Sequence, residues 1–455
     1  MHKGIFMWND LREKAFEPVN NAPLVFFRVA FGLLIMLEGI GAIFTGWVYQ
    51  NTIQPEFTIP FMDFSWLQPL PGYGMYVWFF VMGMAGLFVM IGYHYRLAVL
   101  FYLILWAGIY FMQKTSYNNH YYLLVLLLLF MLLLPAHRRF SVDARRNPEA
   151  FSYVCPHWCI GIFIVKMAIV YFYAGINKIY PDWLESTTVS LFFSGKEDFW
   201  LIGPLLAHEG FQQMVAWGGI LFDLLIVPLM LFRSTRLLGL AMLLFFHIFN
   251  SAVFHIGIFP YMMIAMAVFF YPPNQIDRWF FKGYGTESLR NNTPSASSWS
   301  LQAKNLLLIA FALYFVWQAV LPLRHHFFDS EVNWSEEGHR LSWRMMLRSK
   351  SGFGDFYIKD RNDEEARLQY TDFQERLTPK QNRRVAVRPD MTWQVAQRIH
   401  EHYKQEEDRE VAVYFDGKAR LNDRDHQPLI DPDTDLAAVE WHRFKSKDWI
   451  LPLKE

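Results

Sequence analysis

Long apolar runs in the first 320 residues constrain the fold of this chain more than any other feature. The clearest of them, HYYLLVLLLLFMLLLP at 120–135, contains no charged residue. A helix of about 20 predominantly apolar residues crosses a bilayer core. The chain is only 18% charged, whereas water-soluble chains average about 25% charged residues. The charge deficit lies in these runs, so we expect membrane spans rather than a large soluble core.

The apolar runs predict about nine transmembrane helices, near 24–45, 72–92, 97–112, 120–135, 160–178, 212–232, 237–254, 256–271 and 303–322. Cytoplasmic loops retain Lys and Arg, and basic residues recur after every second predicted span. This alternation predicts a cytoplasmic N-terminus and an extracytoplasmic location for everything after Leu323. The polar N-terminus lacks a cleavable signal pattern, and only two cysteines are present. Both features fit a multi-pass protein of a bacterial inner membrane.

A change of composition at about residue 323 predicts two domains, a transmembrane catalytic domain at 1–322 and an extracytoplasmic domain at 323–455. We expect a polytopic α-helical membrane protein with a C-terminal β-rich α+β domain. Strands are predicted at GDFYIKD and RRVAVRPD, an amphipathic helix at 391–404, and a hairpin turn at Asp416-Gly417 in VAVYFDGKARL. Lys+Arg and Asp+Glu both total 42, and no clustered basic face suggests a nucleic-acid partner.

Ionisable residues inside the predicted spans are costly to bury and are therefore functional candidates. Glu38 and Asp223 lie deep in their spans and are expected to pair with basic groups, whereas Lys166 is expected to reach the membrane surface. Lys178 ends the run MAIVYFYAGINKIYPDW, where it is either an interfacial anchor or, against an apolar wall, a base or nucleophile.

Three histidines lie near the predicted level of Lys178 in the membrane. The topology puts His120 and His255 at that level and His247 about two turns deeper. A lone histidine is more often structural than catalytic, but the convergence of several on one lysine makes both interpretations comparable. The spacing of His247 and His255 is not that of a metal-binding pair at i, i+4, and we predict no metal site.

The sequence resembles the vitamin K-dependent γ-glutamyl carboxylase family over six ordered blocks: FFRVAFGLLIMLE, KTSYNNHYYL, IVYFYAGINKIYPDW, WGGILFDLL, FFHIFNSAVFHIGIFPYMM and SWRMMLRSKS. The resemblance covers the membrane part and continues to PLIDPDTDLA. It implies that Lys178 is the catalytic base, assisted by His120, and that Asn119, His247 and His255 bind the quinone. The animal enzymes tend to have two adjacent lysines where this chain has Asn177-Lys178, and they extend further at the C-terminus.

The resemblance implies that reduced vitamin K, as phylloquinone or menaquinone hydroquinone, is oxidised by O2 to its epoxide. This oxidation generates a base strong enough to remove the γ-proton of glutamate, to which CO2 then adds, so the site must exclude water. The implied partners are membrane lipid and a glutamate-containing peptide or protein on the extracytoplasmic side. Two alternatives stay open: a quinone-epoxidising oxygenase without protein carboxylation, and a non-enzymatic lipid-binding membrane protein.

Overall fold

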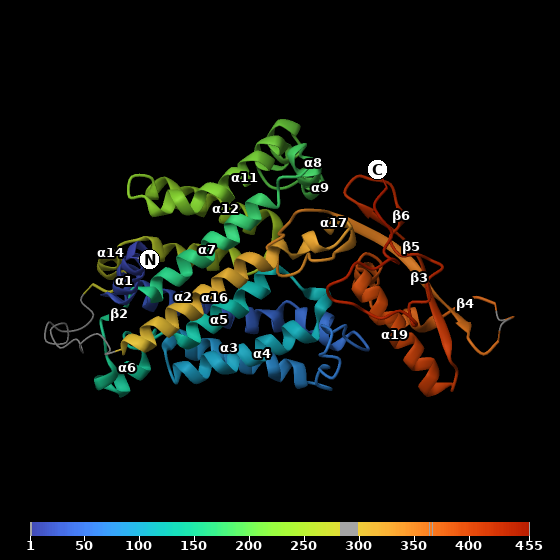
Figure 1. Cartoon of the computed structure of the whole chain (residues 1–455), viewed down its shortest axis with the longest axis horizontal. Coiled ribbons are helices and arrows are strands. Elements are labelled where there is room, and N and C mark those ends of the chain that lie inside the picture. The colour runs from blue at the N-terminus through green and yellow to red at the C-terminus, as the bar shows by residue number, and fades with distance from the viewer. Residues whose placement is uncertain (1, 283–298, 364, 366, 455) are drawn as a thin grey trace.

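The computed structural model describes residues 2–282, 299–363, 365 and 367–454, and consists of a helix bundle beside a C-terminal domain (Figure 1). Seven helices of these residues are long and apolar enough to cross a membrane: α2 (Ala22–Phe44), α3 (Gly74–Ile91), α4 (Tyr95–Met112), α7 (Trp158–Ile176), α11 (Glu209–Leu231), α12 (Arg236–Phe254) and α16 (Leu301–Val320), which continues as a 3-10 helix to Phe327. The predicted class, a polytopic helical membrane protein, is confirmed.

The two other predicted spans correspond to shorter apolar segments. These are α5 (Asn119–Leu133) and α13 (Phe259–Met266), which continues as a 3-10 helix to Phe270. At 1.5 Å per residue, neither segment reaches across a hydrocarbon core of about 30 Å. Nine is therefore an upper limit on the number of crossings among the described residues. The side chain of Asn118 begins α5 by accepting a hydrogen bond from the Tyr121 amide at 2.8 Å.

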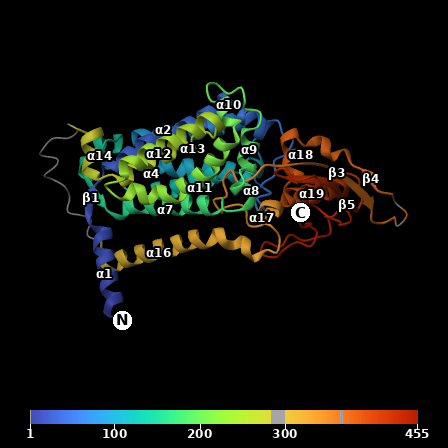
Figure 2. The same cartoon turned by 90° about the horizontal axis from the view of Figure 1, so that it is seen from above.

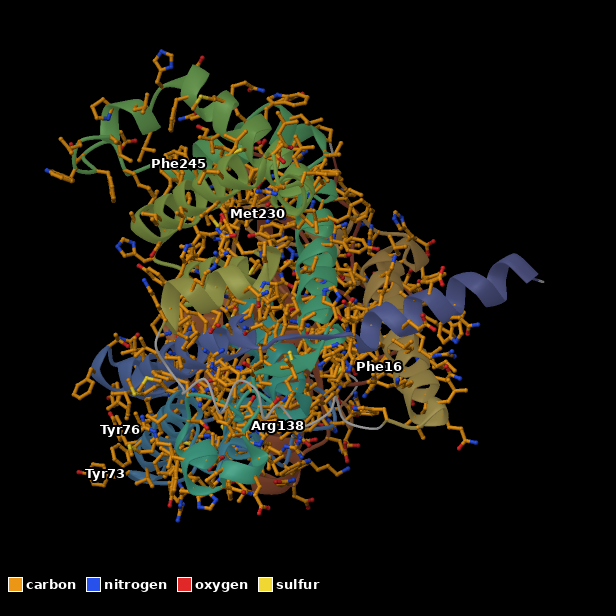
Figure 3. The ribbon with its side chains drawn as sticks, turned by 90° about the vertical axis from the view of Figure 1, so that its left-hand side faces the viewer. Phe16, Tyr73, Tyr76, Arg138, Met230 and Phe245 are labelled. Carbon is orange, nitrogen blue, oxygen red and sulfur yellow. The ribbon has the colours of Figure 1, made fainter. Side chains whose placement is uncertain are left out.

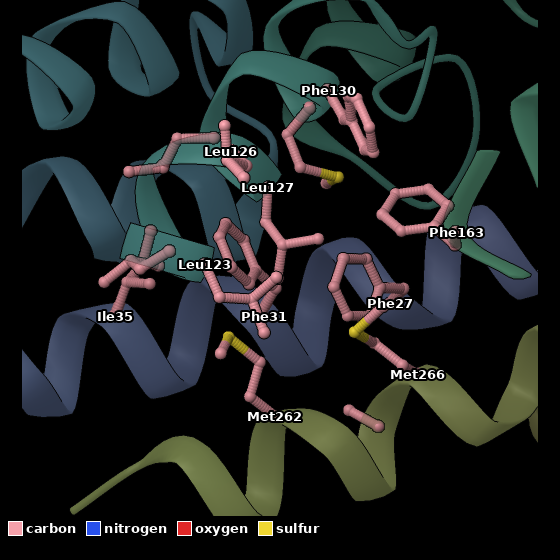
Figure 4. Packing of buried hydrophobic residues seen from close by; sticks show 14 of the residues in the cluster. Phe27, Phe31, Ile35, Leu123, Leu126, Leu127, Phe130, Phe163, Met262 and Met266 are labelled. Carbon is pink, nitrogen blue, oxygen red and sulfur yellow. The ribbon is translucent and has the colours of Figure 1, made fainter. Parts of the chain in front are cut away.

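The bundle core forms where α2, α5, α7 and α13 meet. Phe27, Phe31 and Ile35 of α2 face the leucines of α5 and the methionines of α13 (Figure 4). α2 also lies close against α3, because a Cβ atom on Gly32 would collide with the backbone of Met90. Small residues commonly permit such close approach between membrane helices. This core fixes the first turn of α5, where His120 lies.

α16 runs alongside the bundle with α1 (His2–Phe16) crossing its first turns (Figure 2). The Asn305 side chain of α16 accepts hydrogen bonds from Trp8 at 3.3 Å and from Arg12 at 3.1 Å. Deeper in the bundle, the Lys166 ammonium of α7 donates to Gln318 of α16 at 2.5 Å and is fully buried. The prediction that Lys166 reaches the membrane surface is therefore wrong, because α16 covers it and supplies a polar partner.

The C-terminal domain contains a four-stranded antiparallel sheet in the order β4-β3-β5-β6, which confirms the sheet of the predicted β-rich α+β domain. Its long strands, β3 (Lys350–Asp360) and β5 (Val411–Leu421), pair along their whole length, and β4 (Gln369–Tyr370) and β6 (Gln427–Pro428) flank them. The predicted helix at 391–404 lies within α19 (Pro389–Glu406) and is confirmed. The sheet and α19 enclose a second hydrophobic core.

Two local predictions for this domain are wrong. Asp416-Gly417 is not a hairpin turn, because β5 continues through it and Gly417 pairs with Gly354 of β3. The Phe415 ring occupies the space that a side chain on either glycine would need. The predicted strand at 383–390 instead contains the end of α18 (Pro379–Val385) and the start of α19. A capping box between Thr378 and Gln381 fixes α18 as a helix.

Buried ion pairs hold the C-terminal domain against one end of the bundle. Lys114, just before α5, contacts Asp390 of α19 at 2.5 Å, and Arg340 donates to both oxygens of the same carboxylate at 2.8 and 3.0 Å. Asp182, just after α7, accepts hydrogen bonds from Arg424 and Asn422 of the sheet domain. The domain is therefore fixed at the end of the bundle where α5 begins and α7 ends.

Candidate functional site

An apolar cavity of about 320 Å³ lies among α7, α11 and α12, and we call it the lysine cavity. Phenylalanines dominate its wall; one of them, Phe245, projects from α12 and is labelled in Figure 3. Its lining includes the polar side chains His120, Tyr171, Lys178, Asp223, His247 and Asn250. A largely apolar cavity of this size with a few convergent polar groups is typical of a small-molecule site.

Lys178 lies two residues beyond the last residue of α7, where Pro181 starts the short helix α8 (Pro181–Leu184) and turns the chain. Its side chain is only 8% exposed and lines the lysine cavity. The ammonium lies 5.4 Å from the Trp183 ring centre and donates to the Ala174 carbonyl at 3.4 Å. The aromatic face and the carbonyl together orient the amine.

Asp223 of α11 forms an ion pair with Lys178, and its side chain is buried as well. The prediction that Asp223 pairs with a basic group is confirmed. Burial in an apolar wall penalises both charges, and the pair persists because each partner compensates the other. The structure therefore places an amine and a carboxylate side by side in the apolar wall of the cavity.

His247 of α12 faces the same cavity. It is almost fully buried, and its Nε2 atom lies 2.7 Å from the Tyr171 hydroxyl of α7. A hydrogen bond to one ring nitrogen fixes the orientation of the imidazole and leaves the other nitrogen for a ligand. The structure therefore brings His247 and Lys178 to one cavity from different helices.

His120 stacks on Phe259 of α13, with ring centres 3.8 Å apart and planes inclined by 13°. It lines the lysine cavity and also a second cavity of about 510 Å³, which we call the glutamate cavity after Glu38. Tyr121 and His255 line the glutamate cavity too. His255 does not line the lysine cavity; it is exposed and caps α12 in a left-handed conformation.

Asn119 lines neither cavity. Its amide donates to the Arg344 carbonyl at 2.8 Å and its oxygen accepts from the Tyr117 hydroxyl at 3.1 Å. These bonds hold the segment 341–346, whose Met345 and Met346 do line the lysine cavity. Asn177 supports the same segment by donating to the Ser342 carbonyl at 3.0 Å. Both asparagines therefore contact the segment that closes one wall of the cavity.

Sequence reasoning did not identify Asp223 as the partner of Lys178, nor Tyr171 as the partner of His247. An aspartate within the apolar run WGGILFDLL was the available signal for the first. The prediction that Glu38 pairs with a basic group is wrong, because the partner of its carboxylate in the structure is the Tyr121 hydroxyl. Among the described residues, no group of three or more His, Cys, Asp or Glu side chains could hold a metal ion.

A larger cavity, of about 620 Å³, lies between the 57–68 segment and α19. Its lining includes Trp393, Arg398 and Trp441 but none of the buried lysine and histidine side chains described above. Size alone therefore does not identify the reactive centre. The buried ion pair of Lys178 makes the lysine cavity the stronger candidate, because ionisable groups are placed in an apolar site only at a substantial energetic penalty.

Two family models match the chain. The HTTM domain matches residues 16–275, which is more than half of the chain and includes both cavities apart from Met345 and Met346. The vitamin K-dependent gamma-carboxylase, lumenal domain, matches residues 303–455, which contain most of α16 and the sheet domain. No solved structure matches the chain.

Proposed function

Because the chain belongs to the vitamin K-dependent gamma-carboxylase family, we propose that it oxidises reduced vitamin K to the epoxide and couples this oxidation to the carboxylation of protein glutamate. Lys178 is the proposed base. The observation that carries the proposal is the buried ion pair of Lys178 with Asp223 in an apolar cavity that also contains His120 and His247.

The cavity residues fit a naphthoquinone ring. The wall is mainly aromatic and aliphatic, which suits a lipid-soluble ligand, and the polar groups are few. Lys178 and His247 can hydrogen-bond oxygens on such a ring, and His120 is flat against Phe259 at the edge of the cavity. When bound, reduced vitamin K supplies with O2 the oxidation that generates the base for the γ-proton of glutamate.

The chain itself performs proton handling and positioning in this proposal. The Lys178 amine accepts a proton from a ligand hydroxyl, and Asp223 stabilises the resulting ammonium. Tyr171 keeps the His247 ring in place. Phe222, Phe246 and Phe259 exclude water from around the amine, because a strong base would otherwise be quenched.

Orientation follows from the same proposal. The C-terminal domain is bonded to the end of the bundle nearest Lys178 through Asp182 and Arg424. A glutamate-containing peptide would therefore reach the cavity from the side of that domain. Together with the distribution of Lys and Arg, this supports a cytoplasmic N-terminus and an extracytoplasmic C-terminal domain.

Incubation of the purified full chain in lipid nanodiscs with reduced vitamin K, O2, ¹⁴C-bicarbonate and a glutamate-rich peptide tests the proposal. Label in the peptide together with vitamin K epoxide is the expected result. Epoxide without peptide label would instead identify an oxygenase that does not carboxylate protein. Absence of both products would leave lipid binding as the activity of the cavity and reject the enzyme.

A further inference from the structure

The glutamate cavity has no role in the chemistry proposed above, although it adjoins the lysine cavity. The two cavities share three lining residues, His120, Ile256 and Phe259. Among these, only His120 can accept and release a proton. A proton that passes between the two cavities through their shared lining must therefore pass through this imidazole, whose stacking on Phe259 fixes its plane.

Glu38 lies within the membrane-spanning helix α2. Among the described residues, no ion pair joins its carboxylate to a lysine or an arginine. Its recorded partner is the Tyr121 hydroxyl. It also lies against the turn after α12, since a Cβ atom on Gly257 would lie 3.9 Å from its Oε2 atom. An acidic side chain at this depth is costly to maintain, and Asp223, by contrast, is explained by its lysine.

The titratable groups around Glu38 come from three parts of the chain. His120 and Tyr121 belong to α5, His255 follows α12, and Tyr102 of α4 donates to the Ile35 carbonyl behind α2. His255 is exposed at the rim of the glutamate cavity. The cavity, at about 510 Å³, is large enough for several water molecules between these groups.

The reaction proposed for this chain must release one proton in each turnover. The two hydroxyl protons of reduced vitamin K and the γ-proton of glutamate enter, together with O2 and CO2. The products are the epoxide, one water molecule, the new carboxylate and one proton, so atoms and charge balance. A cavity that excludes bulk water needs a defined route for that proton.

We propose that the glutamate cavity is this route: His120 passes the proton to the Glu38 carboxylate through cavity water, Tyr121 orients that carboxylate, and His255 delivers the proton to solvent at the rim. The proposal rests on the proposed function and deepens it. It assigns Glu38 as a proton carrier that touches neither the quinone nor the peptide.

Substitution of Glu38 tests the route, with epoxide formation by the full chain in nanodiscs as the readout. Glu38→Gln keeps an oxygen that can accept from Tyr121 but cannot carry a proton. It is expected to lower kcat by about 100-fold, the effect of losing a proton-transfer group, with the KM for reduced vitamin K unchanged. Glu38→Asp is expected to retain most of the activity. Glu149→Gln, the same change at an exposed carboxylate that lines neither cavity, is the matched control and should behave as the wild type.

Chemical rescue separates proton transfer from a structural role. In Glu38→Ala, added formate or acetate is expected to restore kcat, because a small acid can occupy the vacated space and carry the proton. Unchanged kcat in Glu38→Gln would overturn the route, and so would a loss of activity that neither Glu38→Asp nor the added acids restore. Wild-type protein that forms no epoxide would reject the proposed function itself, which is a distinct result.

Discussion

Lys178 and Asp223 come from different helices, α7 and α11, and form a buried ion pair in the wall of an apolar cavity. In the proposed function, the amine handles a proton at this contact, where the cavity wall is mainly apolar. It also gives α11 a chemical role that its sequence suggests only through one aspartate in an apolar run.

Asp223→Asn is expected to lower the rate of epoxide formation by about 10- to 100-fold, because the Lys178 ammonium loses the anion that stabilises it. Asparagine has nearly the same shape, so the cavity should keep its affinity for the quinone. Measurement of kcat and KM for reduced vitamin K checks both statements. A normal kcat in this variant would show that the ion pair only joins two helices.

Gly219→Leu is expected to abolish quinone-dependent activity by filling the lysine cavity. A Cβ atom at this position would have ordinary contacts, 3.7 Å to Trp183 and 4.0 Å to Lys178, so a longer side chain extends into the cavity. Gly161→Leu is the matched control, because Gly161 of α7 faces open space. Binding of a quinone analogue, measured by fluorescence quenching, should fail for Gly219→Leu alone. Normal binding there would place the quinone elsewhere.

Gln318→Leu is expected to destabilise the protein by about 1–3 kcal/mol, because it removes the hydrogen-bond acceptor of the buried Lys166. The double variant Lys166→Met/Gln318→Leu should recover most of that loss, since an apolar pair of similar volume replaces a buried cation. Thermal unfolding in detergent measures the effect. Equal losses in the single and double variants would contradict the burial of Lys166 under α16.

The ionisation of the Asp390 carboxyl determines how the stability of the folded protein is expected to change at acidic pH. Burial alone would raise the pKa of this carboxyl, but the charges of Arg340 and Lys114 outweigh it and hold the pKa well below its usual range. The folded state therefore favours the carboxylate, and this stabilisation is complete above the unfolded pKa of about 3.9. It disappears as the pH falls through the lower folded pKa.

The unfolding temperature of wild type should accordingly exceed that of Asp390→Asn by a constant margin between about pH 5 and pH 7, corresponding to roughly 3–5 kcal/mol for a broken buried pair. The margin should shrink only below about pH 4. Parallel unfolding scans of the two proteins in detergent measure it. A margin that disappears already near pH 6 would contradict the assigned ionisation of Asp390.

The helical architecture was predictable because each of the seven long helices is an apolar run, such as 24–45, that can be recognised without knowledge of its neighbours. The strands of the C-terminal sheet were harder to predict from the sequence. Asp416-Gly417 has the sequence of a hairpin turn, yet it lies within a continuous strand. A glycine is needed at 417 because the Phe415 ring occupies the space of a side chain there. That explanation depends on the cross-strand partner Gly354, which local sequence does not reveal.

The candidate site shows the same limit. Lys178, His120 and His247 were selected for residue type and depth, and the structure gathers all three at one cavity. The amide of Asn119 instead bonds to Arg344, more than 200 residues away in the sequence. A contact between residues so far apart cannot be predicted from the periodicity of the sequence. The roles proposed for Asn119 and His255 stay predictions.

The rate of vitamin K epoxide formation by Lys178→Ala, in nanodiscs with saturating reduced vitamin K and O2, tests whether Lys178 is the base. The expected result is a fall of about 10²- to 10⁴-fold, the contribution of a positioned base, with quinone binding retained. Epoxide formation at the wild-type rate would contradict the assignment of the amine as the base.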